Sequence, residues 1–151
     1  MNRVGRSARI GLGVVIAVYA AANGLLFLPN VTLVRLGVPP LFFPEKPSPF
    51  LTVLVEIPWW QFVIWPVAIG FLSWAAVRLL AGRAAVKIYA AAVAIDLAFL
   101  SLLKIAGARS GRSGAIDPDY IVAAVLLLIL VAVWATEHRQ KSIRGDADNP
   151  D

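Results

Sequence analysis

One carboxyl group lies within a long apolar run and is the residue of this chain best placed to do chemistry. Asp96 lies twelve residues into the run 84–104, which is about 18 Å along an α-helix. An ionisable side chain at that depth of a membrane faces the interior of a helix bundle and often has a function. Removal from water favours its neutral form. The sequence leaves two interpretations open: a structural hydrogen bond to a neighbouring helix, or proton exchange with a ligand.

Other residues share the depth or the helical face of Asp96. Asn23 lies about 21 Å beyond Arg9, at a similar depth. An Asn23–Asp96 contact between two helices would contribute about 0.6–2 kcal/mol as structural support, or it would orient the carboxyl group toward a lipophilic ligand. Tyr89 and Phe99 lie on the face of Asp96, at i−7 and i+3. The predicted ligand-binding residues in this region are Asn23, Tyr19, Tyr89 and Phe99.

A second polar group precedes the second long apolar run. Glu56 comes two residues before Pro58, and Trp60 and Gln61 follow at the expected membrane boundary. An ion pair between Glu56 and Lys104 is the simpler interpretation. The alternative makes Glu56 the mouth of a pocket above Asp96. We therefore take Asp96 and Glu56 as candidate catalytic residues, with Gln61 and Trp60 as further ligand-binding candidates.

Much other chemistry is excluded by composition. The chain has no cysteine, which removes disulfides and thiol chemistry, and its single histidine, His138, makes a zinc site improbable. No phosphate-binding loop or metal-binding motif occurs, so we expect no cofactor and no metal. The net charge of +5 comes from basic residues at the edges of apolar runs. That placement is explained by membrane topology, and we expect no nucleic acid partner.

The elements that must position these residues are membrane helices. Hydrophobic residues make up 60% of the 151 residues and charged residues 15%, against about 25% charged in soluble domains. Four apolar runs are each long enough to cross the bilayer. The predicted fold is an all-α integral membrane protein, a four-transmembrane-helix bundle with antiparallel up-down topology, in one domain, 1–144. The expected helices are about 10–28, 59–81, 84–104 and 118–136.

The connections follow from the residues at the helix ends. Pro29 and Asn30 are expected to end the first helix, which leaves an external segment, 30–58, in which the five prolines between residues 39 and 49 oppose a long helix. Asp117 and Pro118 are typical of a helix start. The last residues, 145–151, are polar and acidic, and we expect them to be disordered.

Orientation follows from the basic residues. Nine lysines and arginines lie on the side of the termini and five on the other, so the positive-inside rule places both termini in the cytoplasm of a cell with this protein in its cytoplasmic membrane. An alternative is a signal peptide cleaved near Ala20–Ala22. Because the apolar pattern continues to Leu28, we favour a retained helix.

Several short motifs resemble a known group. Gly24-Leu-Leu-Phe-Leu-Pro29 with Leu36-Gly37, the stretch Trp65-Pro-Val-Ala-Ile-Gly-Phe-Leu72, and Ala94-Ile-Asp-Leu-Ala98 are similar to small bacterial four-span membrane proteins of the DoxX-like group, over about residues 9–105. The resemblance implies a four-helix bundle and, from some members, an association with quinone-linked oxidoreductases.

Three functional hypotheses remain. The first is a small inner-membrane protein that binds a lipophilic ligand of quinone or isoprenoid type, or that serves as accessory subunit to a membrane partner or a homo-oligomer. The second is an isomerase or cyclase that uses Asp96 and Glu56 as acid and base on an isoprenoid-like substrate. The third and weaker hypothesis is a proton-coupled transporter with Asp96 as proton carrier.

Overall fold

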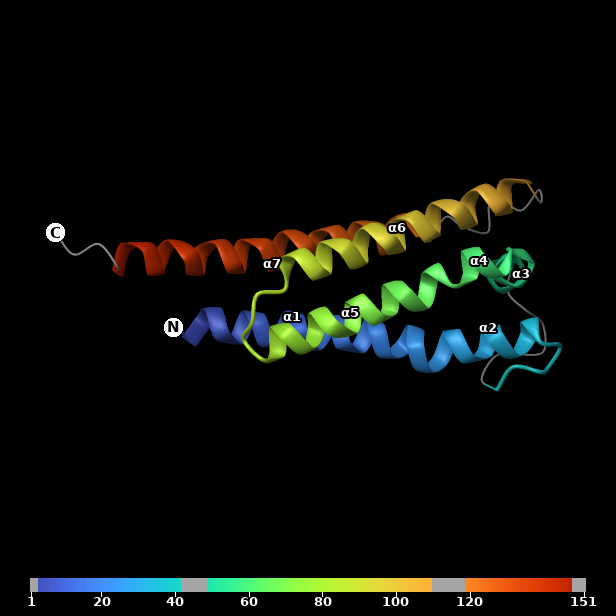
Figure 1. The fold of residues 1–151 in the computed structure, drawn as a ribbon, viewed down its shortest axis with the longest axis horizontal. Coiled ribbons are helices and arrows are strands. Elements are labelled where there is room, and N and C mark those ends of the chain that lie inside the picture. Colours follow the sequence, from blue (N-terminus) through green and yellow to red (C-terminus); the bar gives the residue numbers. More distant parts are fainter. Residues whose placement is uncertain (1–2, 42–48, 110–118, 148–151) are drawn as a thin grey trace.

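The fold is a bundle of long helices, which Figure 1 shows from the side with the long axis of the molecule horizontal. The computed structural model describes residues 3–41, 49–109 and 119–147, and in these ranges all regular secondary structure is helical. In chain order the elements are α1 (Arg3–Ala21), the π-helix η1 (Ala22–Phe27), α2 (Leu28–Arg35), α3 (Pro49–Glu56), α4 (Trp59–Phe62), α5 (Ile64–Leu80), α6 (Val86–Arg109) and α7 (Asp119–Ala147).

Four helical stretches are long and apolar enough to cross a membrane, which confirms that part of the predicted fold. They are Gly5–Arg35, Trp59–Leu80, Val86–Arg109 and Ile121–Arg139. The last helix extends to Ala147, so residues 145–147 are helical where disorder was expected. The first proline of that segment is Pro150, and nothing before it prevents the helix from continuing. Residues 148–151 lie outside the described ranges.

The first long helix does not end at Pro29, contrary to the prediction. Proline lacks an N–H and its ring clashes with the carbonyl four residues earlier in an α-helix. Here the preceding turn is the wider η1, in which the Leu28 N–H bonds the Asn23 carbonyl five residues back. The expected external segment therefore begins after Arg35, where Gly37 adopts a positive φ of 76° and ends the helix.

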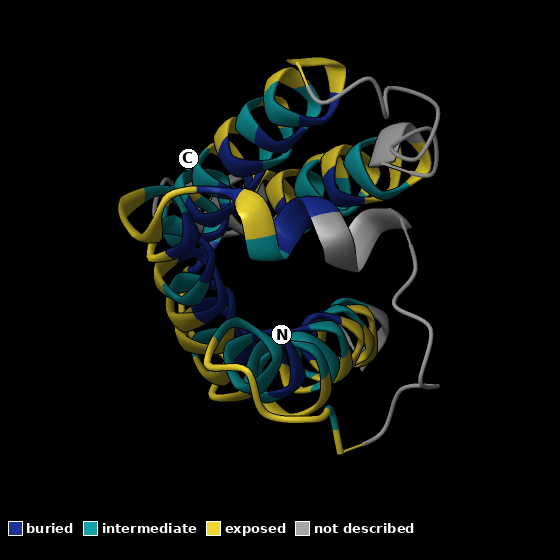
Figure 2. Ribbon diagram, turned by 90° about the vertical axis from the view of Figure 1, so that its right-hand side faces the viewer, coloured by how far each residue is buried: buried dark blue, intermediate teal, exposed yellow. Residues whose placement is uncertain are grey.

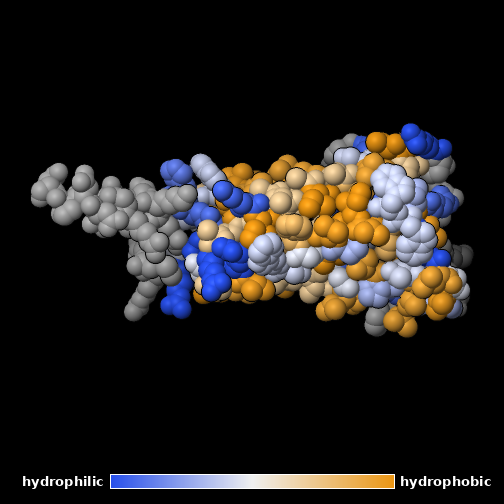
Figure 3. Space-filling view, in the orientation of Figure 1, coloured by the Kyte–Doolittle hydropathy of each residue, from blue (hydrophilic) through white to orange (hydrophobic). Residues whose placement is uncertain are grey.

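The packed faces of the helices point into the bundle, as the dark blue segments in Figure 2 show. One cluster of buried side chains joins α1, α5, α6 and α7 and includes Ile16, Leu72 and Tyr89. A second cluster includes Val31, Trp65 and Phe99. The outer surface is apolar over the middle of the molecule and more polar toward the ends (Figure 3). This distribution suits helices surrounded by lipid.

Glu137 of α7 joins four segments at one end of the bundle. Its Oε1 accepts hydrogen bonds from the backbone N–H groups of Ala85 (2.6 Å) and Val86 (3.0 Å) at the start of α6. The Arg9 guanidinium of α1 lies 3.9 Å from the same oxygen and donates to the Gly82 carbonyl at 3.0 Å. Because the first amides of a helix have no partner within it, the carboxylate of α7 serves as the cap of α6.

Arg35 performs the corresponding role at the opposite end. Its guanidinium donates to the carbonyls of Leu54 (2.7 Å) and Ile57 (2.8 Å), at the end of α3. It also lies over the Trp59 ring, 4.2 Å from the centroid. The arginine thereby attaches α3 and α4 to the end of α2, and its charge is stabilised by carbonyl groups and an aromatic face.

We expect Glu137→Ala to lower the free energy of unfolding by about 3 kcal/mol, because it leaves Arg9 as a buried charge and uncaps α6. The matched control is Arg139→Ala, two residues along on the exposed face, with an expected change below about 0.5 kcal/mol. Denaturant titration in mixed micelles measures both. Equal effects of the two substitutions would contradict the role assigned to Glu137.

Candidate functional site

The structure brings Tyr19 of α1 to Asp96 of α6. The Tyr19 hydroxyl donates a hydrogen bond of 3.2 Å to Asp96 Oδ2. Asp96 is buried, with 3% of its surface exposed, in agreement with the expectation that it faces the bundle interior. The hydroxyl and the carboxyl group thus form a polar contact between two otherwise apolar helices.

Asn23 differs from its expected role as the partner of Asp96. Its side-chain amide donates to the Tyr19 carbonyl at 2.9 Å, within its own helix. This bond lies where α1 passes into η1, a transition at which the regular pattern of backbone hydrogen bonds changes. Asn23 therefore supports the turn of helix that presents Tyr19, and the contact to Asp96 that we describe comes from Tyr19, one turn earlier.

An apolar cavity of about 230 Å³ adjoins this contact. It lies between α1, α5, α6 and α7, and we call it the tyrosine cavity. Its lining residues are Val15, Ile16, Tyr19, Leu72, Tyr89, Ile121, Val122, Val125, Leu126 and Ile129. Both tyrosine hydroxyls donate to protein acceptors, Tyr19 to Asp96 and Tyr89 to the Leu126 carbonyl at 3.3 Å, and the cavity surface is almost wholly apolar. All other lining side chains are aliphatic, so the cavity suits an apolar occupant.

The tyrosine cavity opens toward the outside of the bundle between α1 and α7. Three of its lining residues are among the exposed large apolar side chains: Val15 (52%), Ile121 (70%) and Val125 (48%). Val15 and Val125 lie within two candidate spans, and Ile121 is the first residue of the second of these. The opening is therefore at the surface that would face lipid if the chain is inserted in a membrane.

Phe99 belongs to the packed core. Its ring stacks on that of Trp65, with centroids 5.7 Å apart and an interplanar angle of 9°, and only 2% of its surface is exposed. It does not line the tyrosine cavity. Its place on the face of Asp96 is thus explained by packing between α5 and α6.

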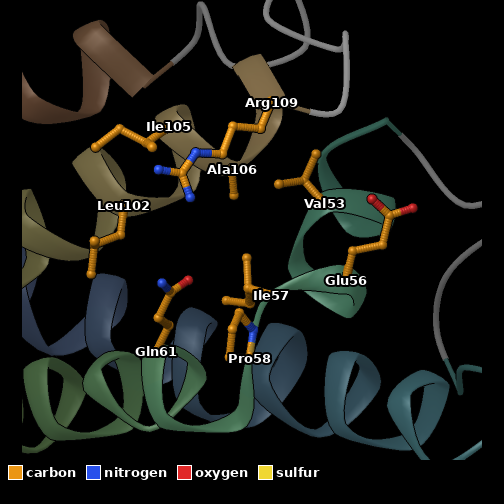
Figure 4. Close-up of a pocket in the computed structure, with 9 residues that line it drawn as sticks. All are labelled: Val53, Glu56, Ile57, Pro58, Gln61, Leu102, Ile105, Ala106 and Arg109. Carbon is orange, nitrogen blue, oxygen red and sulfur yellow. The ribbon is translucent and has the colours of Figure 1, made fainter.

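Glu56 and Gln61 line a different cavity, of about 540 Å³, at the end of the bundle that carries Arg35. In Figure 4 the side chains of Gln61 and Arg109 reach toward its centre, whereas the Glu56 carboxylate points away. Gln61 Oε1 is buried and has no hydrogen-bond partner among the described residues. Trp60 is 64% exposed and does not line this cavity.

The two cavities are separate, which corrects the interpretation of Glu56 as the mouth of a pocket above Asp96. They share no lining residue. Along α5 and α6, the stacked Trp65 and Phe99 lie between the residues of the two cavities. Glu56 is therefore not placed to act on a ligand together with Asp96, and Tyr19 takes its place beside the carboxyl group.

A metal centre has no support in the described part of the chain, where no three histidine or acidic side chains lie close enough to hold an ion. His138 lies beside Trp134, with ring centroids 5.3 Å apart. No family model, curated protein or solved structure matches the chain. The DoxX-like resemblance consequently stays a hypothesis. The function is inferred from the geometry of the Tyr19–Asp96 contact and the tyrosine cavity.

The Tyr19–Asp96 contact is testable with a double-mutant cycle. We expect Tyr19→Phe and Asp96→Ala to be coupled by about 0.6–1.7 kcal/mol in unfolding free energy, as for hydrogen bonds between membrane helices. The control cycle pairs Asp96→Ala with Thr32→Val, which removes a hydroxyl bonded within α2 and should be additive within about 0.5 kcal/mol. A coupling of zero in the first cycle would show that the hydroxyl does not bind the carboxyl group.

Proposed function

We propose that the chain is a multi-pass protein of the cytoplasmic membrane, with its four long helical stretches arranged antiparallel, up and down. The apolar surface between two polar ends supports insertion. Arg9, the turn at Gly82 and Glu137 all meet at one end, which is the end richer in basic residues by sequence. The positive-inside rule assigns that end to the cytoplasm.

This topology predicts the behaviour of reporter fusions. Fusions after Arg83 and at the C-terminus should report a cytoplasmic location, and a fusion near Lys46 an external one. Intact-mass measurement of the mature chain separates this topology from cleavage near Ala22. An external C-terminus would contradict the even number of spans.

Within this frame, the function that the geometry supports best is binding of a lipophilic ligand of quinone or isoprenoid type in the tyrosine cavity. The observation that carries the proposal is an almost wholly apolar cavity, lined in part by the rings of two tyrosines, with an opening between α1 and α7. A ligand with a long apolar tail reaches such an opening from the bilayer. A ring or chain segment of the ligand then fits the apolar walls, and a ligand oxygen gains a donor where Tyr19 or Tyr89 turns from its present acceptor.

The volume of the tyrosine cavity limits what it holds. About 230 Å³ lies below the range of about 300–1,000 Å³ for pockets that enclose a drug-sized ligand. The cavity is thus suited to one ring or a short part of a chain. The Tyr89 hydroxyl, whose bond to the Leu126 carbonyl is long at 3.3 Å, is the donor most easily redirected to a ligand carbonyl.

An acid–base enzyme is the second candidate, and the Tyr19–Asp96 hydrogen bond favours it. A tyrosine hydroxyl held by a buried carboxyl group, at the wall of a dry cavity, is able to pass a proton between substrate and carboxyl group. Asp96→Asn distinguishes the candidates, because the amide keeps an acceptor for Tyr19 but carries no exchangeable carboxyl proton. A binding protein with this substitution keeps its ligand and its cellular role, whereas an enzyme loses its product.

Closing the opening should weaken binding. We expect Val125→Trp, at the rim of the tyrosine cavity, to raise the Kd for a decyl-substituted benzoquinone probe about tenfold or more. Leu128→Trp adds the same bulk to an exposed position of α7 that does not line the cavity, and it should leave the Kd within about twofold. Equilibrium binding to protein in nanodiscs measures both.

A photoreactive form of the same probe locates the site. Cross-links should fall on peptides of α1 and α7, near Val15 and Val125. Equal affinities of the two tryptophan variants, or cross-links confined to the cavity around Gln61, would contradict the tyrosine cavity as the binding site. Absence of probe binding to the folded wild-type chain would favour the accessory-subunit hypothesis.

A further inference from the structure

A third cavity lies where α1 and α5 meet at the Arg9 end of the bundle. It measures about 320 Å³ and is lined by Arg6, Arg9, Ile10, Leu79, Leu80, Ala81 and Gly82. Arg6 is exposed, whereas Arg9 is 5% exposed. Two arginines in one cavity, at the level where a helix leaves the membrane, form a site for an anion.

Arg9 is held in place by Gly82, which also lines this cavity, and by Glu137. Its terminal nitrogens engage the Gly82 carbonyl and approach the Glu137 carboxylate. Its Nε is buried and has no hydrogen-bond partner among the described residues. A buried N–H group without an acceptor destabilises the folded chain. An anion oxygen that accepts from Arg9 Nε would remove this destabilisation. Arg6, free of such fixed contacts in the described part, supplies the second charge.

An apolar groove lies further along the same two helices. It measures about 380 Å³, and small residues such as Ala21, Gly24 and Ser73 form much of its wall. Leu80 lines both the arginine cavity and the groove. It rests on Gly13, where an added Cβ would lie 3.0 Å from the Leu80 side chain. The cationic cavity and the apolar groove thus lie in the same seam between α1 and α5, with Leu80, packed on Gly13, between them.

We propose that this seam binds one anionic glycerophospholipid, with its phosphate at Arg6 and Arg9 and one acyl chain in the groove. The proposal rests on the membrane insertion argued above. A free phosphate ion would leave the groove unused, and a helix of a partner would leave the arginine cavity without an anion. An anionic lipid is complementary to both parts, because its phosphate group fits the arginine cavity and its acyl chain fits the apolar groove.

The test begins with recovery of the chain in alkali-washed membranes. The chain is then transferred to mixed micelles that contain equimolar phosphatidylglycerol and phosphatidylcholine. Native mass spectrometry measures the ratio of the two lipids bound to it. We expect enrichment of phosphatidylglycerol on the wild-type chain. In Arg6→Gln the enrichment should fall about fivefold, the effect of one basic residue near an anionic headgroup. Arg83→Gln removes an exposed arginine outside the cavity and should leave the ratio unchanged.

Filling the groove tests the acyl-chain part. Ala21→Leu places a larger side chain in the groove and should reduce bound phosphatidylglycerol, whereas Ala98→Leu on the exposed face of α6 should not. Equal losses in Arg6→Gln and Arg83→Gln, no effect of Ala21→Leu relative to its control, or complete competition by inorganic phosphate would each overturn the proposal.

The outcomes separate this proposal from the one on which it rests. A chain washed from membranes by alkali would contradict membrane insertion and would overturn the lipid site with it. A chain that stays in the membrane but shows no preference for phosphatidylglycerol would overturn the lipid site alone.

Discussion

The carboxylate of Glu137 is the contact on which the arrangement of the long helices depends. It accepts the first amides of α6 and lies beside Arg9 of α1, which in turn holds the turn at Gly82. These groups lie close to apolar helices, where an unsatisfied amide or an unpaired charge is expensive. The contact therefore fixes the lengthwise position of α7 against α6 and α1.

The tyrosine cavity follows from that position. One turn into α6 from the Glu137 contact, the Tyr89 hydroxyl bonds the Leu126 carbonyl of α7, and across the bundle Tyr19 bonds Asp96. α1 packs much more extensively against α5 than against α7. The cavity opens on this looser α1–α7 side, so the ligand site proposed here lies where α1 is packed less extensively.

Features that depend on the residues of a single helix, such as its length and its buried face, could be predicted from the sequence. Contacts between residues of different helices could not. Four apolar runs predicted four long helices, and the depth of Asp96 predicted its burial. Pro29 was misjudged because a π-turn, for which the sequence has no clear signal, carries the helix through it. Asn23 has the right depth, but Tyr19, four residues earlier on the same face, was the better guide to the partner of Asp96. Glu137 was missed because its partners lie 51 and 52 residues away in the sequence.

Cross-linking across the proposed opening in intact membranes tests the tyrosine cavity as a ligand site. The chain has no native cysteine, so Val15→Cys combined with Val125→Cys gives a single reactive pair, on α1 and α7 at the rim of one cavity. With a short bismaleimide we predict an intramolecular cross-link in the double variant, reduced when a decyl-benzoquinone without free ring positions, which does not add the cysteine thiols, occupies the opening. Efficient labelling of each single variant, with no intramolecular cross-link in the double variant, would contradict this prediction.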